Sequence, residues 1–401
     1  MTHAHGSWRR AAEAARLLGP RGEVAPTVFA EMSALASATG AINLGQGYPD
    51  EDTPDVVRNA AREAISSGQN QYAPGRGTAD LLDAVAHHQR RFYGLDWDPA
   101  TEIIATAGAT EALAATLLAL LDGPDDEVMV FEPFYDAYAA LIGLAGARLV
   151  PVPLRWPHFQ PDLDELTAAV TDRTRAILVN DPHNPTGTVL SHEAKSRIVE
   201  LAERHDAVII TDEVYEHLVF EQPHVPIAAL PGAASRTVSI SSGGKTFRAT
   251  GWKIGWITAP ADLVTPVLAV KQYLTYANGT PFQTAIARGL SMGDDFFDRV
   301  ATDMRRKASV LGAGLAAAGF EVSSPAATYF TVADASALGF DDAAEFCREL
   351  PRLAGVIGVP LTAFVTAEHH DEYRSLVRFA ACKRLDVLEE AASRLGGIEC
   401  G

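Results

Sequence analysis

The feature that most constrains the fold is a series of short apolar runs that alternates with helical patterns from about residue 100 onward. Five runs are rich in β-branched residues and apolar almost without a break, which is typical of strands in a parallel sheet covered on both faces. They are "EIIATAG" (102–108), "EVMVFEP" (127–133), "RAILVND" (175–181), "AVIITDE" (207–213) and "RTVSISS" (236–242). The alternation predicts a doubly wound α/β domain that binds its ligands at the carboxyl ends of the strands.

A different pattern follows towards the C-terminus. Residues 295–319 are predicted to form a long amphipathic helix, and a second helix is expected around 341–354. Strand patterns occur in "YFTVAD" (329–334) and "SLVRFAAC" (375–382). This part of the chain predicts a smaller α+β domain.

The length of 401 residues fits about two domains. We expect an N-terminal segment, 1–45, that packs with the small domain. The large ligand-binding domain is expected over 46–285 and the small domain over 286–401.

Charge and cysteine content exclude several function classes. A net charge of −18 argues against nucleic acid or an anionic membrane as the main partner. The longest apolar runs, such as residues 112–121, are too short to span a bilayer. Cys347, Cys382 and Cys400 form neither a disulfide framework nor a metal-binding spacing. We therefore expect a cytoplasmic protein and predict no metal site.

Small and polar residues follow the predicted strands. Gly108, Ala109 and Thr110 lie at a strand-to-helix turn, where free N–H groups favour an anion; an ordinary turn capped by Thr110 is the alternative. Asn184 lies in the rigid loop "NDPHNPTG" (180–187), where it binds a ligand or only stabilises the turn.

Asp212 ends an apolar strand, and Tyr215 follows three residues later. A buried carboxylate needs a cation or hydrogen bonds, yet no lysine or arginine lies between Arg204 and Arg236. The partner of Asp212 is therefore distant in sequence or a ligand, unless Asp212 only caps a helix.

Two of the six lysines occur in "SSGGKTFRATGWKIGW" (241–256). Lys245 follows a strand and a Gly-Gly turn, and Lys253 lies in an apolar strand pattern. Buried amines lose their proton easily and attack carbonyl groups, although both could be surface lysines. Arg378 interrupts an apolar strand, which suits a substrate carboxylate or a structural role.

Together these groups are what pyridoxal 5′-phosphate requires, and the sequence resembles the class I/II aminotransferases of fold type I. The resemblance runs from about Val28 to Arg394 and rests on motifs in family order: "NLGQGYPDE", "NQYAPGRG", "GATEA", "EPFYDAY", "HNPTG", "TDEVYEH", "SSGGKTFRATGWKIGW", "KQYLTY" and "LVRFAACK". Within the family, the chain is most similar to the kynurenine, glutamine and methionine aminotransferase branch and to actinobacterial N-succinyldiaminopimelate aminotransferase-like proteins. The fold implied is a mostly parallel seven-stranded sheet beside a smaller α+β domain.

The resemblance implies a role for each motif residue. Lys245 would carry the cofactor as an internal aldimine and transfer the proton. Asp212 would pair with the pyridine nitrogen, Tyr215 and Asn184 would bind the ring oxygen, and Tyr135 would stack on the ring. The phosphate would be bound by Gly108, Ala109, Thr110, Ser242 and Lys253.

The resemblance also implies the substrates and the assembly. An L-amino acid and a 2-oxo acid would bind through Arg378, Asn184 and the backbone at Gly47. Phe29, Tyr48 and the loop 275–280 of a partner subunit would line the side-chain pocket. Tyr72 would reach the phosphate of the neighbouring subunit, so we expect a homodimer with shared active sites.

Two alternatives to transamination remain at this stage. The same cofactor residues also serve elimination, replacement or carbon–carbon bond formation, for example on S-adenosylmethionine or a cysteine conjugate. A regulator built on this fold is disfavoured by the net charge and the full catalytic set. Gly243-Gly244 and Ala277–Thr280 depart from the succinyldiaminopimelate enzymes, which leaves the amino donor open.

Overall fold

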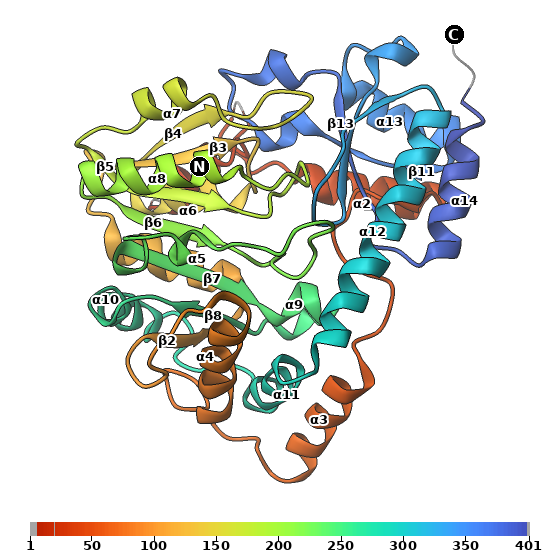
Figure 1. Ribbon diagram of the computed structural model, residues 1–401. Helices are drawn as coiled ribbons and strands as arrows, with labels where there is room; N and C mark the ends of the chain where they lie inside the picture. The colour runs from red at the N-terminus through yellow and green to blue at the C-terminus, as the bar shows by residue number, and fades with distance from the viewer. Residues whose placement is uncertain (1–5, 20, 399–401) are drawn as a thin grey trace.

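The computed structural model describes residues 6–19 and 21–398, so Cys400 and the first five residues lie outside it. Two lobes are visible in Figure 1, a large one built on a sheet and a smaller one beside the long helix α12 (Asp294–Ala317). Within these residues, no helix has the length and apolar content needed to cross a bilayer.

The large lobe contains the predicted seven-stranded sheet. Its strands run in the order β2 (Ile103–Thr106), β8 (Gly255–Thr258), β7 (Thr237–Ser242), β6 (Val208–Asp212), β5 (Thr174–Asn180), β3 (Glu127–Glu132) and β4 (Arg148–Pro153). Strand β8 is antiparallel to both of its neighbours, and the other adjacent pairs are parallel. All five predicted strands are confirmed to within two residues, whereas β4 and β8 were not predicted.

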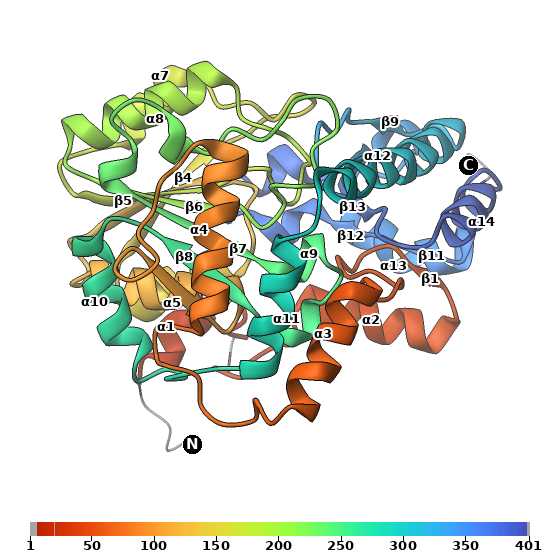
Figure 2. The same ribbon diagram turned by 60° about the horizontal axis from the view of Figure 1, so that its bottom comes forward.

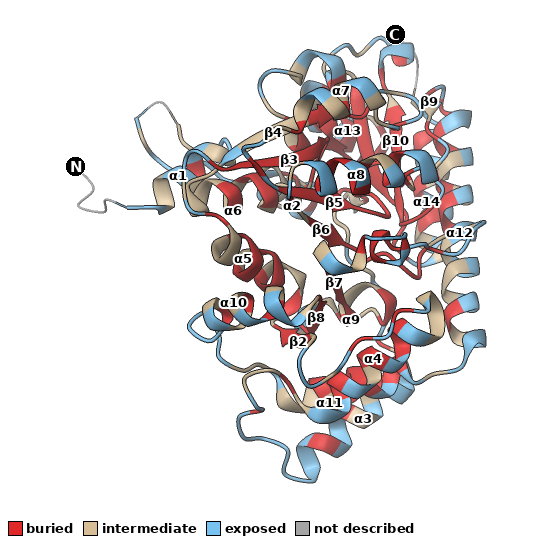
Figure 3. Ribbon diagram, turned by 60° about the vertical axis from the view of Figure 1, so that its left-hand side comes forward, coloured by how far each residue is buried: buried red, intermediate tan, exposed pale blue. Residues whose placement is uncertain are grey.

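Helices cover both faces of this sheet, as Figures 2 and 3 show. One face carries α5 (Gly108–Leu120), α6 (Ala137–Ala145) and α10 (Ala261–Lys271); the other carries α4 (Ala79–Tyr93), α7 (Leu163–Ala169) and α8 (His192–Arg204). Successive residues of β3 alternate between the two cores, with Val128 and Val130 in one and Met129 and Phe131 in the other. This double burial explains the unbroken apolar run at the centre of β3.

The smaller lobe contains a four-stranded antiparallel sheet in the order β12 (Val359–Pro360), β13 (Leu376–Ala380), β10 (Phe330–Asp334) and β9 (Glu321–Val322). A two-stranded parallel sheet joins β1 (Ile42–Asn43) to β11 (Val356–Ile357). Helices α12, α13 (Ala343–Ala354) and α14 (Leu385–Leu395) complete the lobe. The predicted α+β arrangement is therefore present.

The predicted N-terminal segment divides between the lobes. Helix α1 (Trp8–Ala14) packs on α6 of the large lobe, whereas α2 (Val28–Thr39) packs on α13, β11 and β12. Helix α11 (Thr280–Leu290) packs on α3 (Asp55–Ser66) and on α4, and it runs through the expected boundary at 285/286. The domain division stays a prediction, and the helix bounds favour a boundary after α11.

One local prediction was wrong. Lys253 is not in a strand: its φ of 53° ends the 3-10 turn Thr250–Trp252, and β8 begins only at Gly255. A positive φ is incompatible with an extended strand. The side chain is exposed instead of buried.

Candidate active site

A cavity of about 430 Å³ lies at the carboxyl ends of β5, β6 and β7, bounded by residues of the smaller lobe. It brings together every predicted site residue except Tyr72. These are Phe29, Gly47, Tyr48, Gly108, Ala109, Thr110, Tyr135, Asn184, Asp212, Tyr215, Ser242, Lys245, Lys253 and Arg378. Side chains that are far apart in sequence thus face one space, while their individual roles stay predictions.

One end of the cavity suits an anion. The φ of Gly108 is +76°, and a Cβ there would lie 3.3 Å from Cε of Lys253. A side chain on Gly255 would meet the carbonyl carbon of Gly108 at 2.7 Å. The close approach therefore needs glycine both at the start of α5 and at the start of β8. The first N–H groups of α5 have no partner within the helix and open on the cavity beside Ser242 and the Lys253 ammonium.

Asp212 lies at the floor of the cavity, at the end of β6. It is 5% exposed, and its carboxylate accepts a hydrogen bond of 2.7 Å from Tyr138 Oη and a longer one, 3.4 Å, from the N–H of Val214. Burial raises its pKa to about 6, although those hydrogen bonds and the charge of Lys245 act in the opposite direction. Among the described residues no cation forms an ion pair with Asp212, so a cationic ligand group would stabilise it.

Lys245 lies on the short helix α9 (Gly243–Thr246), directly after β7. Its Nζ is 3.5 Å from the carbonyl oxygen of Gly47 and 5.7 Å from the ring centre of Tyr215. Burial lowers the pKa of this amine, and the positive charges of Arg378 and Lys253 add to the effect. An amine without a carboxylate partner and with a lowered pKa is suited to attack a carbonyl group.

Arg378 projects from β13 between aromatic rings. Its Cζ lies 4.3 Å from the ring centre of Phe330 and 4.6 Å from that of Phe364. Nη1 donates to Asn184 Oδ1 at 2.9 Å and Nη2 to the carbonyl of Gly45 at 2.6 Å, whereas the buried Nε has no partner. Burial lowers its pKa to about 10, so the guanidinium stays charged at neutral pH and can bind a carboxylate.

Sequence reasoning missed several residues at the site. Tyr138 holds Asp212, and Asn180 Nδ2 donates to the carbonyl of Asp212 at 2.7 Å. Asn180 Oδ1 also accepts from the N–H of Asn184, so it fixes both chain segments. Tyr329 Oη donates to Gly47 at 2.6 Å. The motifs "EPFYDAY" and "NDPHNPTG" contain the first two, but only the fold shows which polar residue turns inward.

Tyr72 lies outside the cavity of its own chain. It is 84% exposed, and its ring packs edge-on against Tyr276 at 5.8 Å. The loop 275–280 is anchored to the same chain, because Thr275 Oγ1 donates to Glu111 at 2.5 Å and Asn278 Nδ2 to Thr106 at 3.2 Å. Neither Tyr72 nor the loop 275–280 lines the cavity of this chain.

Comparisons with known proteins agree with this geometry. Residues 39–395 match the family described as aminotransferase class I and II. A probable N-succinyldiaminopimelate aminotransferase DapC of Mycobacterium tuberculosis is 49% identical over 380 residues, covering 92% of this chain and 96% of the relative. A methionine aminotransferase of Escherichia coli is 38% identical, covering 93% and 96%. The solved N-succinyldiaminopimelate aminotransferase of M. tuberculosis superposes with a TM-score of 0.90, covering 94% of this chain and 98% of that structure.

Proposed function

The chain belongs to the aminotransferases of class I and II, enzymes that typically use pyridoxal 5′-phosphate, and we propose that it binds this cofactor through Lys245. The observation that carries the proposal is the position of three charged groups on one cavity. Asp212, Lys245 and Arg378 all face it, and none forms an ion pair within the described chain.

The donor set fits each part of the cofactor. The cradle of Gly108, Ser242 and Lys253 would hold the phosphate, and Asp212 would face a protonated ring nitrogen. When bound, pyridoxal 5′-phosphate supplies an aldehyde that accepts the amino group and a ring that withdraws electrons from the substrate Cα.

The protein's own groups position and move protons. Lys245 would hold the aldehyde end of the cofactor and would accept the proton from the substrate Cα, a role that the lowered pKa of its buried amine favours. Asp212 would stabilise a positive charge on the ring nitrogen; Tyr138 holds its carboxylate and Asn180 holds its backbone carbonyl. Tyr215 and Asn184 would bind the ring oxygen.

Arg378 would bind the substrate α-carboxylate, with Asn184 and the backbone at Gly47 as further contacts. Beyond them the cavity is lined by Phe29, Tyr48 and Phe330, so we expect an extended or apolar side chain on the amino donor. The relatives' names make N-succinyldiaminopimelate and methionine the first donors to test, with 2-oxoglutarate as acceptor.

We further propose a homodimer with shared active sites. Tyr72, Tyr273, Leu274 and Tyr276 form an exposed aromatic surface that a second copy would cover. The buried free thiols of Cys347 and Cys382 support a reducing, cytoplasmic location.

The experiment is a single-turnover reaction of the purified protein with a panel of amino acids under anaerobic conditions. Formation of pyridoxamine phosphate together with the matching 2-oxo acid supports the proposal. Ammonia release with the cofactor left in the aldehyde form would instead indicate elimination. Protein that carries no cofactor, and no label on Lys245 after borohydride reduction, would refute the cofactor assignment.

A further inference from the structure

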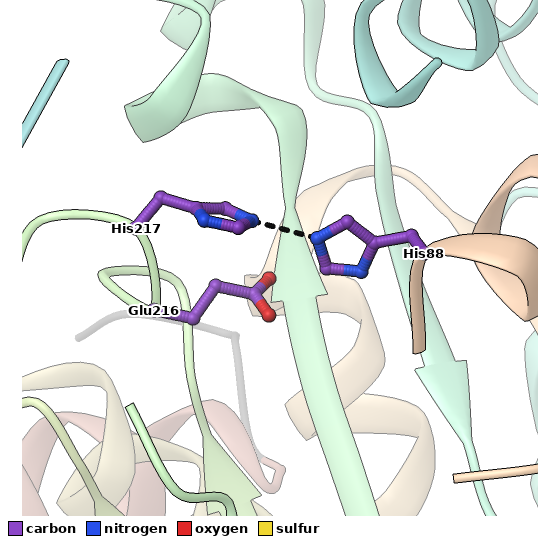
Figure 4. A group of neighbouring side chains, drawn as sticks. All are labelled: His88, Glu216 and His217. Atoms are coloured by element: carbon purple, nitrogen blue, oxygen red, sulfur yellow. Dashed lines mark hydrogen bonds between the residues drawn. The ribbon is translucent and has the colours of Figure 1, made fainter. Parts of the chain in front are cut away.

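Behind the active site, two imidazoles and a carboxylate converge in the protein interior (Figure 4). They belong to His88 on α4 and to Glu216 and His217, which follow Tyr215 in the chain. Their ligand atoms all lie within 4.8 Å of one another, and all three residues are buried. We propose that this cluster is a structural site for a divalent transition metal, Zn²⁺ by its donor set.

The donor chemistry supports this assignment. Two imidazole nitrogens and one carboxylate oxygen are ligands that Zn²⁺ takes in proteins. Tyr93 Oη, 2.6 Å from Oε2 of Glu216, is a further oxygen donor at the cluster.

The charge balance of the cluster also favours a cation. Glu216 is 3% exposed, and its carboxylate accepts hydrogen bonds from the hydroxyls of Tyr93 and Ser241. Within the described chain, Glu216 forms no ion pair. Arg91, whose charge acts on both imidazoles, is paired with Asp294. A divalent ion held between the three side chains would give this deeply buried carboxylate a cationic partner.

Hydrogen bonds within the described chain leave part of the His88–His217 pair unsatisfied. The Nε2 atoms of His88 and His217 are 2.6 Å apart, and two neutral rings can share only one proton there. Nδ1 of His88 is left buried and without a partner in either case. Tetrahedral coordination with bonds of about 2.0–2.1 Å places two ligand nitrogens roughly 3.3 Å apart, so binding requires the rings to separate by less than an ångström.

The surroundings indicate a closed, structural site. Aromatic rings enclose the histidines: Phe297 lies 4.3 Å and Phe92 4.8 Å from the ring centre of His217. None of the three residues lines the cavity where Lys245 lies, so the ion would not meet substrate. It would tie α4 to the segment that carries Tyr215.

The test measures metal content in three forms of the holoenzyme. Wild type, His88→Gln and His87→Gln are expressed in zinc-supplemented medium and purified without a metal-affinity step. His87 is the matched control, because it is the neighbouring histidine on the same helix and is exposed. We expect about one zinc per chain in wild type and His87→Gln, and less than about 0.1 in His88→Gln.

If His88→Gln does not fold, the zinc content of the wild-type protein alone tests the proposal. Zinc X-ray absorption should show two imidazoles and at least one oxygen around the ion. A wild-type protein that contains no zinc, even after refolding with Zn²⁺ present, overturns the proposal. So does equal zinc content in wild type and a folded His88→Gln variant. Neither readout depends on aminotransferase activity.

Discussion

The hydroxyl of Tyr138 donates a hydrogen bond of 2.7 Å to Oδ2 of Asp212, from one wall of the cavity to its floor. Tyr138 is 1% exposed, and its ring packs edge-on against that of Tyr135, which also lines the cavity, with the ring centres 5.7 Å apart. The tyrosine therefore orients the carboxylate that we expect to face the cofactor, while keeping it negatively charged.

Replacing Tyr138 with Phe should lower kcat/KM roughly tenfold or more, because a hydrogen bond to a buried charged group is lost. The pKa of Asp212 should rise, since that hydrogen bond lowers it. Steady-state kinetics across a pH series check both effects. A control, Tyr135→Phe, leaves the Asp212 contact intact and should not change this pH dependence.

The stability of the cofactor-free protein should depend on pH through Asp212. Its pKa is about 6 in the folded chain and 3.8 without the fold, so the folded state binds the extra proton between these values. The contribution of Asp212 to the unfolding free energy should therefore fall by about 3 kcal/mol in all, with about 2 kcal/mol of that lost as the pH rises from 4 to 6 and little change above pH 7.

Denaturant titrations of wild type and Asp212→Asn isolate this contribution, because the amide does not titrate. Relative to Asp212→Asn, wild type should have its highest unfolding free energy at pH 4, and this advantage should shrink as the pH rises. A difference that stays constant from pH 4 to pH 7 would contradict the raised pKa.

Lys245→Ala should reduce turnover by at least about 1,000-fold, since the amine that bonds the cofactor and moves the proton is removed. Mass spectrometry after borohydride reduction should find the cofactor attached at Lys245 in wild type only. The matched variant Lys253→Ala should keep that attachment and bind the cofactor about 10-fold or more weakly, because only a phosphate contact is lost.

Arg378→Lys should raise KM for amino donors roughly 10- to 100-fold, because lysine keeps the charge but not the two-pronged geometry. Cofactor content should match wild type, since Arg378 is expected to contact only substrate. Unchanged KM values for every donor would show that the substrate α-carboxylate does not bind at Arg378.

Shared active sites predict complementation between two defective chains. Tyr72→Ala lacks the residue expected to cross to the neighbour, and Lys245→Ala lacks the one that bonds the cofactor. A hybrid dimer contains one site with both native residues, so each hybrid should show up to about half of wild-type activity. A 1:1 mixture of the variants exchanged by partial unfolding, in which about half of the dimers are hybrids, should recover up to about a quarter. Mixtures no more active than their components, with hybrids shown by mass spectrometry, would contradict shared sites.

The sequence by itself determined the fold class, because strands covered on both faces must be apolar along their whole length. It also pointed to the main candidate site residues, since Asp212, Lys245 and Arg378 are charged groups in apolar surroundings with no partner nearby in sequence. Their positions at the ends of β6 and β7 and on β13 are those expected.

Only the tertiary structure decided which of the remaining residues act together. Tyr138 and Asp212 are 74 positions apart, and His88 and His217 are 129 apart, so no local pattern links them. The apolar neighbours of Lys253 fit a strand pattern, but in the structure its φ is 53° and the residue ends a 3-10 turn before β8 begins. The local sequence indicates which segments form helices or strands and which residues are buried. How those elements pack determines which side chains meet across the sheet.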